Sequence, residues 1–433
     1  MSEPLARALY ALLLRLATPL FLARLWWRGR REPAYRSHWG ERLGWPGGAT
    51  PPVPGRLWLH AVSLGETLAA APLIQALRAQ EPGLQLLLTH GTATGREAGA
   101  KLLQPGDAQA WLPYDTPGAV RRFLRAHRPR IGVLMETEIW PVLLHAAQAE
   151  GVPVVLANAR LSARSARKGQ RLAALLHGAA ARLNAVLAQT EADAQRLRAA
   201  GAPLVQVMGN LKFDITPRPE LLARGRAWRV ALGRPVVLAA VTREGEEAPL
   251  LAAWAALPAA GRPLLLLVPR HPQRFDEVAA LVTQAGFSLQ RRSRWGEAPP
   301  PAAAQADVWL GDSLGEMAQY YACADAALLG GSFAPLGGQN LIEAAACGCP
   351  LLMGPHTFNF AQAAEDALAA GAAERVADLP TAVARALAWV AGDAQAERTR
   401  RADAAVVFAQ THRGAAARMA AAVLALRARP QAR

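Results

Sequence analysis

The chain has 433 residues, of which 52% are hydrophobic and 19% are charged, a composition that excludes an intrinsically disordered protein. This length exceeds a single ordinary core, so two domains of roughly 200 residues each are expected. Three cysteines cannot form a disulfide framework, and Cys347 and Cys349 have no histidine near them, which argues against a metal site. Sparse thiols of this kind suit a reducing cytoplasm.

Positive charge exceeds negative charge, with 48 Lys and Arg against 33 Asp and Glu and a formal net charge of +15. Such an excess indicates an anionic partner. The excess is concentrated in residues 1–56 and in residues 158–182, and the second segment contains no acid. No nucleic-acid module is recognisable, and an anionic membrane surface or a phosphorylated substrate accounts for these segments equally well, so we expect no nucleic-acid partner.

The N-terminal segment is rich in leucine and aromatic residues but contains Arg7, Arg15 and Arg24. No run reaches the ~18 uninterrupted apolar residues that a spanning helix needs, and Pro19 is expected to kink the helix. We interpret the segment as a helix lying on a membrane surface, followed by a Trp- and Arg-rich anchor at residues 26–31. The alternatives are an ordinary buried helix, a true span, and a signal peptide that Arg15 disfavours.

After a Pro- and Gly-rich stretch, aliphatic runs of strand length alternate with helical patterns. Such runs are typical of strands buried on both faces of a parallel sheet. The predicted strands are 57–62, 84–89, 131–135, 152–157, 185–189, 205–208, 236–240, 264–268, 307–311, 326–329 and 350–353. We therefore predict a membrane-associated segment (1–46), two Rossmann-like α/β domains (47–213 and 234–433) separated by a linker (214–233), and a terminal helix at 404–426 within the second domain.

Ligands of parallel α/β sheets bind beyond the carboxyl ends of the strands, and unusual polar residues of the first domain gather there. Glu66 follows the first strand, where partial desolvation raises a carboxyl pKa toward that of a working general base. An acid in the first turn of a helix also interacts favourably with the helix dipole, and position alone leaves these two interpretations even. Glu136 and Glu138 follow a later strand and have the same potential, or pair with the basic cluster.

In the second domain the strongest pattern is a glycine-rich stretch at 330–343 that runs from a strand into a helix starting near Asn340. Glycines allow close approach of a ligand to the backbone, helix-start amides suit phosphate, and Glu343 can accept bonds from ribose hydroxyls. The stretch fits neither a Walker loop nor a hydride-cofactor fingerprint, and the alternative is a surface loop with a capped helix. Residues 311–316 repeat the arrangement, and Arg270 follows another strand, where it can neutralise a phosphate.

With these motifs in place, the sequence resembles the Kdo transferases, GT-B glycosyltransferases that pass 3-deoxy-D-manno-octulosonic acid (Kdo) from CMP-Kdo to the lipid A precursor of lipopolysaccharide. The resemblance covers nearly the whole chain. It rests on eight motifs in the family's order: SLGE (63–66), METEIWP (135–141), GNLKFD (209–214), REGEE (243–247), PRHP (269–272), GDSLGE (311–316), GGQNLIE (337–343) and GPHTFNF (354–360).

The resemblance implies two Rossmann-like domains facing across a cleft and an inverting displacement, with Glu66 as general base on a sugar hydroxyl of the lipid acceptor. Glu136 and Lys212 then stabilise the transition state. The N-terminal domain takes the lipid and the C-terminal domain takes the nucleotide sugar. The implied CMP-binding residues are Pro269, Arg270, Leu314, Gly315, Glu316, Asn340, Leu341, Ile342 and Glu343.

The same resemblance implies that CMP-Kdo is a donor substrate, that no cofactor is required, and that the acceptor is the lipid A precursor (lipid IVA). No Asp-x-Asp sequence or histidine cluster suggests a metal, so Arg, Lys and helix termini are expected to meet the charge of the leaving phosphate. The expected location is the cytoplasmic face of the inner membrane, on its anionic surface.

The chain departs from the family pattern at three positions. Gln339 stands where many relatives have His, Leu341 where many have Pro, and Val241 where Ser is expected, but none of these removes a proposed catalytic group. Two other functions compete with the transferase: a nucleotide-sugar epimerase of the same fold, and a non-enzymatic, membrane-bound nucleotide sensor. The epimerase needs no lipid surface, so the basic, aromatic N-terminus argues against it, and the sensor has no need of Glu66.

Overall fold

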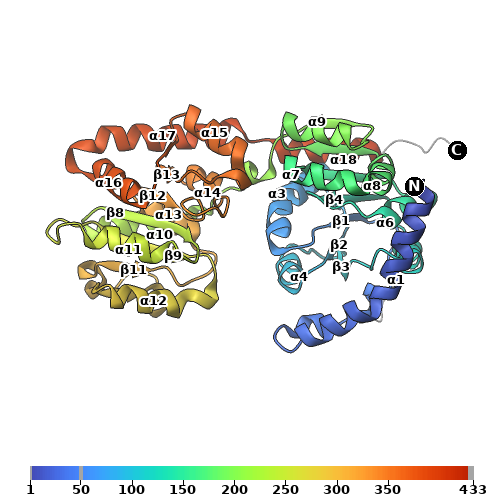
Figure 1. The fold of residues 1–433 in the computed structure, drawn as a ribbon, viewed down its shortest axis with the longest axis horizontal. Coiled ribbons are helices and arrows are strands. Elements are labelled where there is room, and N and C mark those ends of the chain that lie inside the picture. The colour runs from blue at the N-terminus through green and yellow to red at the C-terminus, as the bar shows by residue number, and fades with distance from the viewer. Residues whose placement is uncertain (1, 48–51, 428–433) are drawn as a thin grey trace. The chain divides into compact units, whose positions relative to one another are not determined.

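The computed structural model describes residues 2–47 and 52–427, which fold into two compact α/β units (Figure 1). Unit 1 comprises the chain up to Asp214 together with the segment from Arg413 onward, and unit 2 comprises Ile215–His412. Each unit contains a seven-stranded sheet whose strand pairs are parallel. The prediction of two Rossmann-like domains is confirmed.

The sheet of unit 1 has the strand order β3-β2-β1-β4-β5-β6-β7. Its strands are β1 (Leu57–His60), β2 (Leu86–His90), β3 (Ala108–Trp111), β4 (Ile131–Met135), β5 (Val154–Ala159), β6 (Ala185–Ala188) and β7 (Val205–Val207). The central strands are aliphatic and buried on both faces, as a sheet covered by helices on two sides requires. Strand β3 was not predicted because this edge strand, Ala-Gln-Ala-Trp, is short, partly polar and only half buried.

Helices cover both faces of this sheet. They are α1 (Glu3–Arg28), α2 (Trp39–Arg42), α3 (Leu64–Gln80), α4 (Ala93–Ala100), α5 (Pro117–His127), α6 (Pro141–Ala149), α7 (Ala163–Gly169), α8 (Ala173–Ala180), α9 (Glu191–Ala199) and α18 (Ala415–Arg427). Residues of α5, α6, α8 and α9 form the core on one face, and residues of α3 and α18 form the core on the other.

Helix α1 is continuous through Pro19 and packs only lightly on unit 1, against α6 and α8 (Figure 1). Its buried residues are Ala6 and Ala11, whereas leucines such as Leu16 and Leu20 are exposed, the latter by 72%. Within residues 2–47 and 52–427, α1 is the helix whose length and apolar composition would allow it to cross a bilayer. Its exposure disfavours the alternative of an ordinary buried helix.

The sheet of unit 2 has the strand order β10-β11-β9-β8-β12-β13-β14. Its strands are β8 (Val236–Thr242), β9 (Leu264–Pro269), β10 (Leu289–Arg291), β11 (Val308–Leu310), β12 (Ala326–Leu329), β13 (Leu351–Met353) and β14 (Ala373–Arg375). The three-residue edge strands β10 and β14 were not predicted, because their short, mostly polar sequences lack an aliphatic run. The helices are α10 (Pro219–Leu232), α11 (Glu247–Ala255), α12 (Phe275–Gln284), α13 (Met317–Cys323), α14 (Leu341–Ala346), α15 (Ala361–Ala369), α16 (Leu379–Val390) and α17 (Gln395–Thr411).

The predicted linker at 214–233 is not an extended connection, since most of it forms α10, which packs against α13. The helices approach so closely that a Cβ at Gly225 would lie 2.2 Å from the carbonyl oxygen of Gln319. Trp228 is buried, and Arg229 pairs with Asp325 at 2.6 Å. The arginines and prolines of this segment made it look polar, but its apolar face belongs to unit 2.

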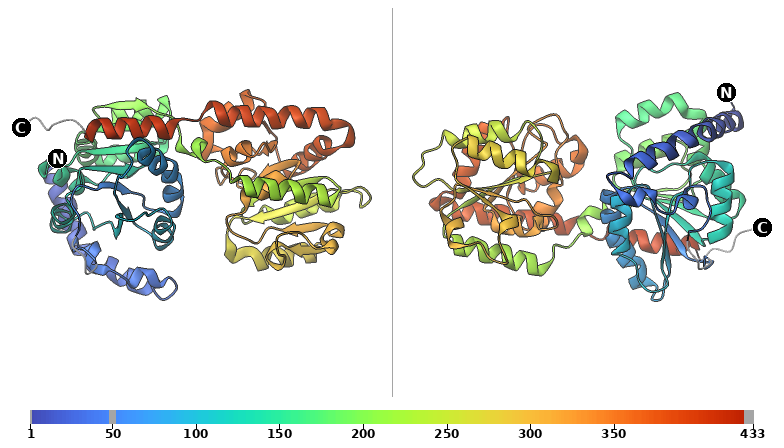
Figure 2. Two further views of the ribbon diagram at one scale, coloured as in Figure 1. Left: turned by 180° about the vertical axis from the view of Figure 1, so that it is seen from behind. Right: turned by 90° about the horizontal axis from the view of Figure 1, so that it is seen from below.

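The terminal helix also differs from the prediction. Helix α17 ends at Thr411, the chain turns at Gly414 (φ 94°), and α18 returns to unit 1, where it packs against α3 (Figure 2). Asp214 fixes this return, because its carboxylate accepts the amide N–H groups of Gly414 (2.6 Å) and Ala416 (2.7 Å). The predicted second domain, 234–433, is therefore wrong at its C-terminal end, since one alanine-rich sequence can cover either sheet.

Candidate active site

Glu66 lies in the first turn of α3, just beyond the carboxyl end of β1. Ser63 caps the helix and accepts the Glu66 amide N–H at 3.4 Å, while the Glu66 carboxylate accepts the Val62 amide N–H at 2.6 Å. The carboxylate thus folds back over the start of its own helix, in the manner of a capping box. Its side chain is half-buried, so the capping interaction holds it at the sheet edge without hiding it.

Glu136 lies at the end of β4, the strand that pairs with β1, and its side chain is buried. Its backbone has φ 56°, a left-handed conformation that costs a non-glycine residue about 1–3 kcal/mol. The amide N–H of Glu136 donates to the carbonyl of Ala157 on β5 (2.9 Å), and its carboxylate accepts the Nε of Arg160 (2.9 Å). Strain of this kind persists at functional sites, where the surrounding contacts enforce it.

The charge of Glu136 acts on the ionisation of both Glu66 and Glu138, so the structure brings these three predicted carboxylates together. Burial raises the pKa of Glu66, and the charge of Glu136 adds to that rise. Burial, followed by the charge of Glu66, raises the pKa of Glu138 to about 7. A carboxyl whose pKa is raised toward neutrality can accept or release a proton near neutral pH.

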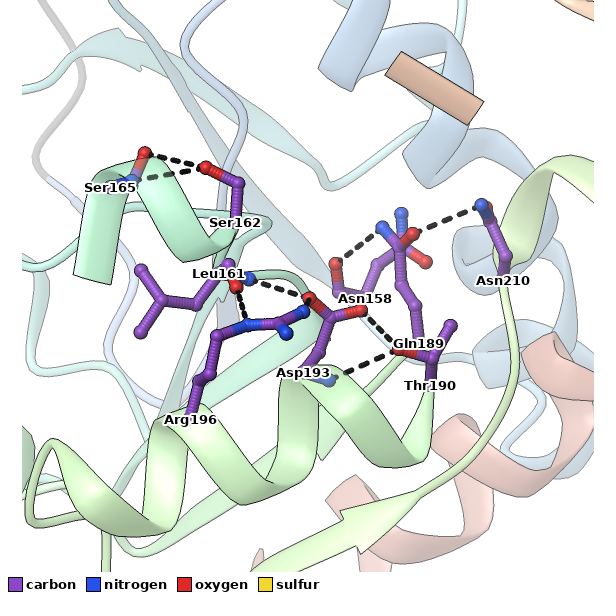
Figure 3. Close-up of polar contacts among 9 residues, drawn as sticks. All are labelled: Asn158, Leu161, Ser162, Ser165, Gln189, Thr190, Asp193, Arg196 and Asn210. Atoms are coloured by element: carbon purple, nitrogen blue, oxygen red, sulfur yellow. Dashed lines mark hydrogen bonds and ion pairs between the residues drawn. The ribbon is translucent and has the colours of Figure 1, made fainter. Parts of the chain in front are cut away.

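Lys212 belongs to the 3-10 helix η3 (Leu211–Asp214), which follows β7 and packs against α3, the helix that carries Glu66. A set of amide side chains ties this segment to β5 and to the end of β6 (Figure 3). Asn158 accepts the Leu211 amide N–H (3.1 Å), Asn210 accepts the Lys212 amide N–H (3.0 Å), and Gln189 links the two asparagines. The backbone of Lys212 is thereby fixed at the edge that carries the glutamates.

Asn158 is fully buried, and its backbone is also left-handed, with φ 51°. Of these two strained residues, Glu136 directly follows β4, and Asn158 is the penultimate residue of the neighbouring strand β5. Gln189 was not predicted to have a role, although a polar residue at the end of an aliphatic strand was a usable signal. Positive φ angles at non-glycine residues left no signal in the sequence.

The loop that leads from β5 into the basic helix α7 is held by α9 (Figure 3). Asp193 accepts the Leu161 amide N–H at 2.9 Å, and Arg196 donates to the Leu161 carbonyl and pairs with Asp193 at 3.0 Å. Ser162 then caps α7. Because Arg160 precedes this loop directly, these contacts also hold the arginine that pairs with Glu136.

In unit 2, Pro269 ends β9 and is buried, while the Arg270 side chain is exposed beyond it. The Arg270 amide N–H donates to the Thr242 carbonyl at 2.9 Å, which ties this loop to the end of β8. Burial raises the pKa of Glu343, and the charge of Arg270 acts in the opposite direction. The structure therefore brings Arg270 and Glu343, two of the predicted nucleotide-binding residues, near each other.

Helix α14 starts at Leu341, and Asn340 caps it by accepting the Ile342 amide N–H at 3.2 Å. The glycine turn before it requires glycine, since Gly337 has φ 89° and a Cβ there would lie 2.4 Å from the Asn359 amide nitrogen. The glycine-rich stretch thus runs through a tight turn into a helix that starts next to Asn340, as the sequence predicted.

In the loop that follows β11, the backbone and one apolar side chain are available to a ligand, whereas the acidic side chain of Glu316 is already bonded. The Glu316 carboxylate accepts Arg292 at 2.7 Å and the Tyr320 hydroxyl at 3.4 Å, so it is engaged within its own surroundings. Gly315 has φ 80°, and the Leu314 side chain at the tip is 76% exposed. Glu316 is therefore suited to shaping the loop, and Leu314 is available to a ligand.

Among the residues that the structure describes, no group of three or more His, Cys, Asp or Glu side chains is placed to hold a metal ion. The cysteines of the second unit, Cys323, Cys347 and Cys349, are unpaired thiols whose pKa burial raises, in the case of Cys323 to about 12.

Two successive parallel α/β units with polar residues at the carboxyl ends of their strands define the GT-B class of fold. Solved structures of this architecture are similar to the chain. Anabaena Alr3699/HepE in complex with UDP has a TM-score of 0.58 and 15% identity and covers 86% of this chain and 100% of that one. UDP-GlcNAc 2-epimerase from Neisseria meningitidis bound to UDP-GlcNAc has a TM-score of 0.57 and 13% identity over the same shares.

Sequence comparison defines the family. The family model described as 3-Deoxy-D-manno-octulosonic-acid transferase (kdotransferase) matches residues 37–215. The 3-deoxy-D-manno-octulosonic acid transferase of Bordetella pertussis is 50% identical over 425 residues, covering 96% of this chain and 98% of the relative. That of Haemophilus influenzae is 37% identical over 359 residues, covering 82% and 83%. The chain belongs to the 3-deoxy-D-manno-octulosonic acid transferase family and is a glycosyltransferase, so the predicted resemblance is confirmed and the epimerase and sensor are not favoured.

Proposed function

We propose that the chain transfers Kdo from CMP-Kdo to the lipid A precursor, with inversion at the sugar carbon. The observation that carries this proposal is the group of three interacting glutamates at one sheet edge of unit 1, in a chain of this family. A hydroxyl nucleophile needs a carboxylate whose pKa is raised but which remains accessible, and Glu66 is half-buried with a raised pKa.

In the proposed step, Glu66 removes the proton of an acceptor hydroxyl while the hydroxyl oxygen forms a bond to the anomeric carbon of Kdo. The bond from that carbon to the CMP phosphate breaks, and its electrons leave with the phosphate. Glu136, held by Arg160, and Lys212, held through its backbone, are assigned to stabilising the transition state. A fixed orientation is what such groups need, because they then reorganise little during the reaction.

The proposed CMP site lies in unit 2 and uses the residues predicted for it: Pro269, Arg270, Leu314, Gly315, Glu316, Asn340, Leu341, Ile342 and Glu343. The exposed guanidinium of Arg270 suits the phosphate, and Glu343 suits a ribose hydroxyl. Glu316 is proposed to act through the shape of its loop. The Arg270 guanidinium can meet the charge of the leaving group, so the proposed reaction uses no metal or other cofactor.

We also propose that α1 attaches unit 1 to the anionic surface of the inner membrane, on its cytoplasmic face, where the lipid acceptor is available. The support is the exposed leucine face of α1, the exposed Trp26 and Trp27 at its end, and the arginines around them. Cation–π contacts place Arg30 and Arg36 over the Trp26 ring, so that cationic and aromatic groups form one anchor.

The test compares wild type with Glu66→Gln, supplied with CMP-Kdo and lipid A precursor. Loss of a general base lowers kcat by about 10³-fold, while binding of CMP stays within about twofold. The matched control is Glu97→Gln, an exposed glutamate of α4, which should turn over like wild type. Absence of Kdo transfer by wild type, or near-normal turnover by folded Glu66→Gln, would overturn the proposal.

A further inference from the structure

Two adjacent carboxylates at the start of α11, Glu246 and Glu247, are almost completely buried, with 3% and 1% exposure. Charged side chains are buried to this extent only when partners compensate them. Both belong to the REGEE motif, to which the mechanism above gives no role. Their partners lie in the loops that carry the proposed CMP-binding residues.

Glu246 holds the glycine-rich loop after β12. One carboxylate oxygen accepts the amide N–H of Gly331 at 2.7 Å and of Arg243 at 2.9 Å, and the other accepts that of Phe333 at 3.3 Å. A fourth amide, that of Ala334, also donates to it. A single carboxylate therefore fixes the loop that leads to Asn340 and α14, and it occupies amides that would otherwise attract an anion.

Glu247 holds the loop after β9. Its carboxylate accepts the Thr242 hydroxyl at 2.8 Å and two nitrogens of Arg274, at 2.7 and 3.2 Å. The Thr242 carbonyl in turn accepts the Arg270 amide N–H. The segment from Pro269 to Arg274 is thus bound at both of its ends, and its exposed Arg270 side chain projects from a fixed backbone.

The backbone between these contacts is strained. Val241 interrupts the pairing of β8 with β9 and has φ 61°, which is a genuine outlier for a β-branched residue. A Cβ at Gly330 would lie 2.4 Å from the Val241 carbonyl oxygen, so the bulge and the glycine loop meet backbone to backbone. Strain of about 1–3 kcal/mol at one residue persists only where neighbours enforce it, and the two carboxylates are those neighbours.

We propose that Glu246 and Glu247 are positioning residues of the donor site, which set the glycine-rich loop and the Arg270 loop in the arrangement that binds the CMP moiety. This inference rests on the proposed function, because it takes CMP as the ligand of unit 2. Neither carboxylate needs to touch the nucleotide, because each acts through the loop that it holds.

The experiment measures CMP binding by calorimetry, and steady-state kinetics with CMP-Kdo and lipid A precursor, on the full chain. Glu246→Gln places an NH₂ group against at least one amide N–H, so we expect CMP affinity to fall about tenfold. The KM for CMP-Kdo should rise by the same factor, with kcat within about twofold and the KM for the acceptor unchanged. Glu247→Gln should act in the same way, and hydrogen exchange of residues 330–335 should accelerate in Glu246→Gln.

Glu220→Gln is the matched control, because this exposed glutamate of unit 2 makes only a 3.5 Å surface pair with Arg218. Thr242→Val removes a single hydroxyl donor and serves if the glutamine variants fold poorly, with an expected loss of about threefold in CMP affinity. Wild-type CMP affinity in the folded variants, or a lower kcat at unchanged KM, would overturn the inference while leaving the proposed function intact. Failure of wild type to bind CMP would overturn both.

Discussion

The acids at the carboxyl edges of the two sheets have different partners. In unit 1, Glu66 and Glu138 lie beside further negative charge and have raised pKa values. In unit 2, hydrogen bonds from Ser293 and Arg291 lower the pKa of Asp312 although burial acts in the opposite direction. The acids of one edge therefore lie beside further acids, whereas acids of the other edge are bonded to arginines, hydroxyls and amides of their own loops.

Two sheets of the same architecture thus use their acidic residues differently. Proton transfer requires a carboxylate that is destabilised as an anion, whereas ligand binding requires loops of fixed shape. The carboxylate oxygens of Glu246, Glu247 and Glu316 all bond to amides, arginines or hydroxyls of their own unit. Conversion of either edge to the character of the other should abolish its function.

The largest effect after loss of Glu66 is expected from Arg270→Ala. Removal of a cation that bonds a phosphate should weaken CMP binding about 10–100-fold, and kcat at saturating donor should fall as well, because Arg270 is also proposed to meet the charge of the leaving phosphate. Calorimetry with CMP measures the loss directly. Arg385→Ala is the control, because Arg385 forms an exposed pair with Glu374 and should bind CMP like wild type. If Arg270→Ala bound CMP as tightly as wild type does, the proposed phosphate site in unit 2 would be contradicted.

The membrane role assigned to unit 1 is tested by Leu16→Asp on the exposed face of α1. Loss of one leucine from the bilayer interface and gain of a negative charge should lower partitioning onto anionic vesicles about tenfold. Sedimentation with vesicles containing phosphatidylglycerol measures this. Val230→Asp changes an exposed valine of unit 2 (80% exposed) and should partition like wild type. Equal loss in both variants would contradict a contact specific to unit 1.

The charge of Glu136 contributes to the raised pKa of Glu66, so Glu136→Gln should lower that pKa. A general base is active when deprotonated, and the acid limb of kcat/KM should therefore move to lower pH. Arg160→Gln removes the cation that neutralises Glu136 and should move the limb to higher pH. Profiles of kcat/KM against pH measure both changes, and shifts in the same direction would contradict the proposed coupling.

The smallest effect concerns stability. The folded-state pKa of Glu138 is about 7, above its ordinary value, so wild type loses stability as pH rises from about 4.5 through 7. Glu138→Gln lacks this loss. The free energy of unfolding of Glu138→Gln, relative to that of wild type, should therefore be about 1–2 kcal/mol higher at pH 8 than at pH 4, after allowance for solvent screening. Denaturant unfolding at the two pH values measures the difference.

Asp312 of unit 2 should show the opposite dependence of stability on pH. The pKa of Asp312 is lowered in the folded state, so its stabilisation is present at neutral pH and lost as pH falls through its folded-state value. Asp312→Asn should therefore cost stability at pH 7 and little in acid. Parallel pH curves for Glu138→Gln and Asp312→Asn would show that the two edges do not differ.

Much of this fold was predictable from the sequence, because buried parallel strands are continuous aliphatic runs and each is followed by its polar residues. The edge strand β3 and the helix α10 escaped prediction, since polar or arginine-rich sequences hide an apolar face that only a tertiary partner reveals. The places of Glu66 and Arg270 at the carboxyl ends of strands were predictable. The contacts of Glu246 were not, because Gly331, its partner, lies 85 residues away.

The return of α18 to unit 1 has a consequence for synthesis of the protein. The face of the first sheet that α18 covers is completed only after residues 215–412 have been made. At about 5–20 residues per second, a ribosome needs roughly 10–40 seconds for that stretch. During this interval the nascent first unit displays an apolar surface that Met419 and Val423 will later bury. A chain that stops near residue 412 never covers this surface, and aggregation rather than partial activity is its expected fate.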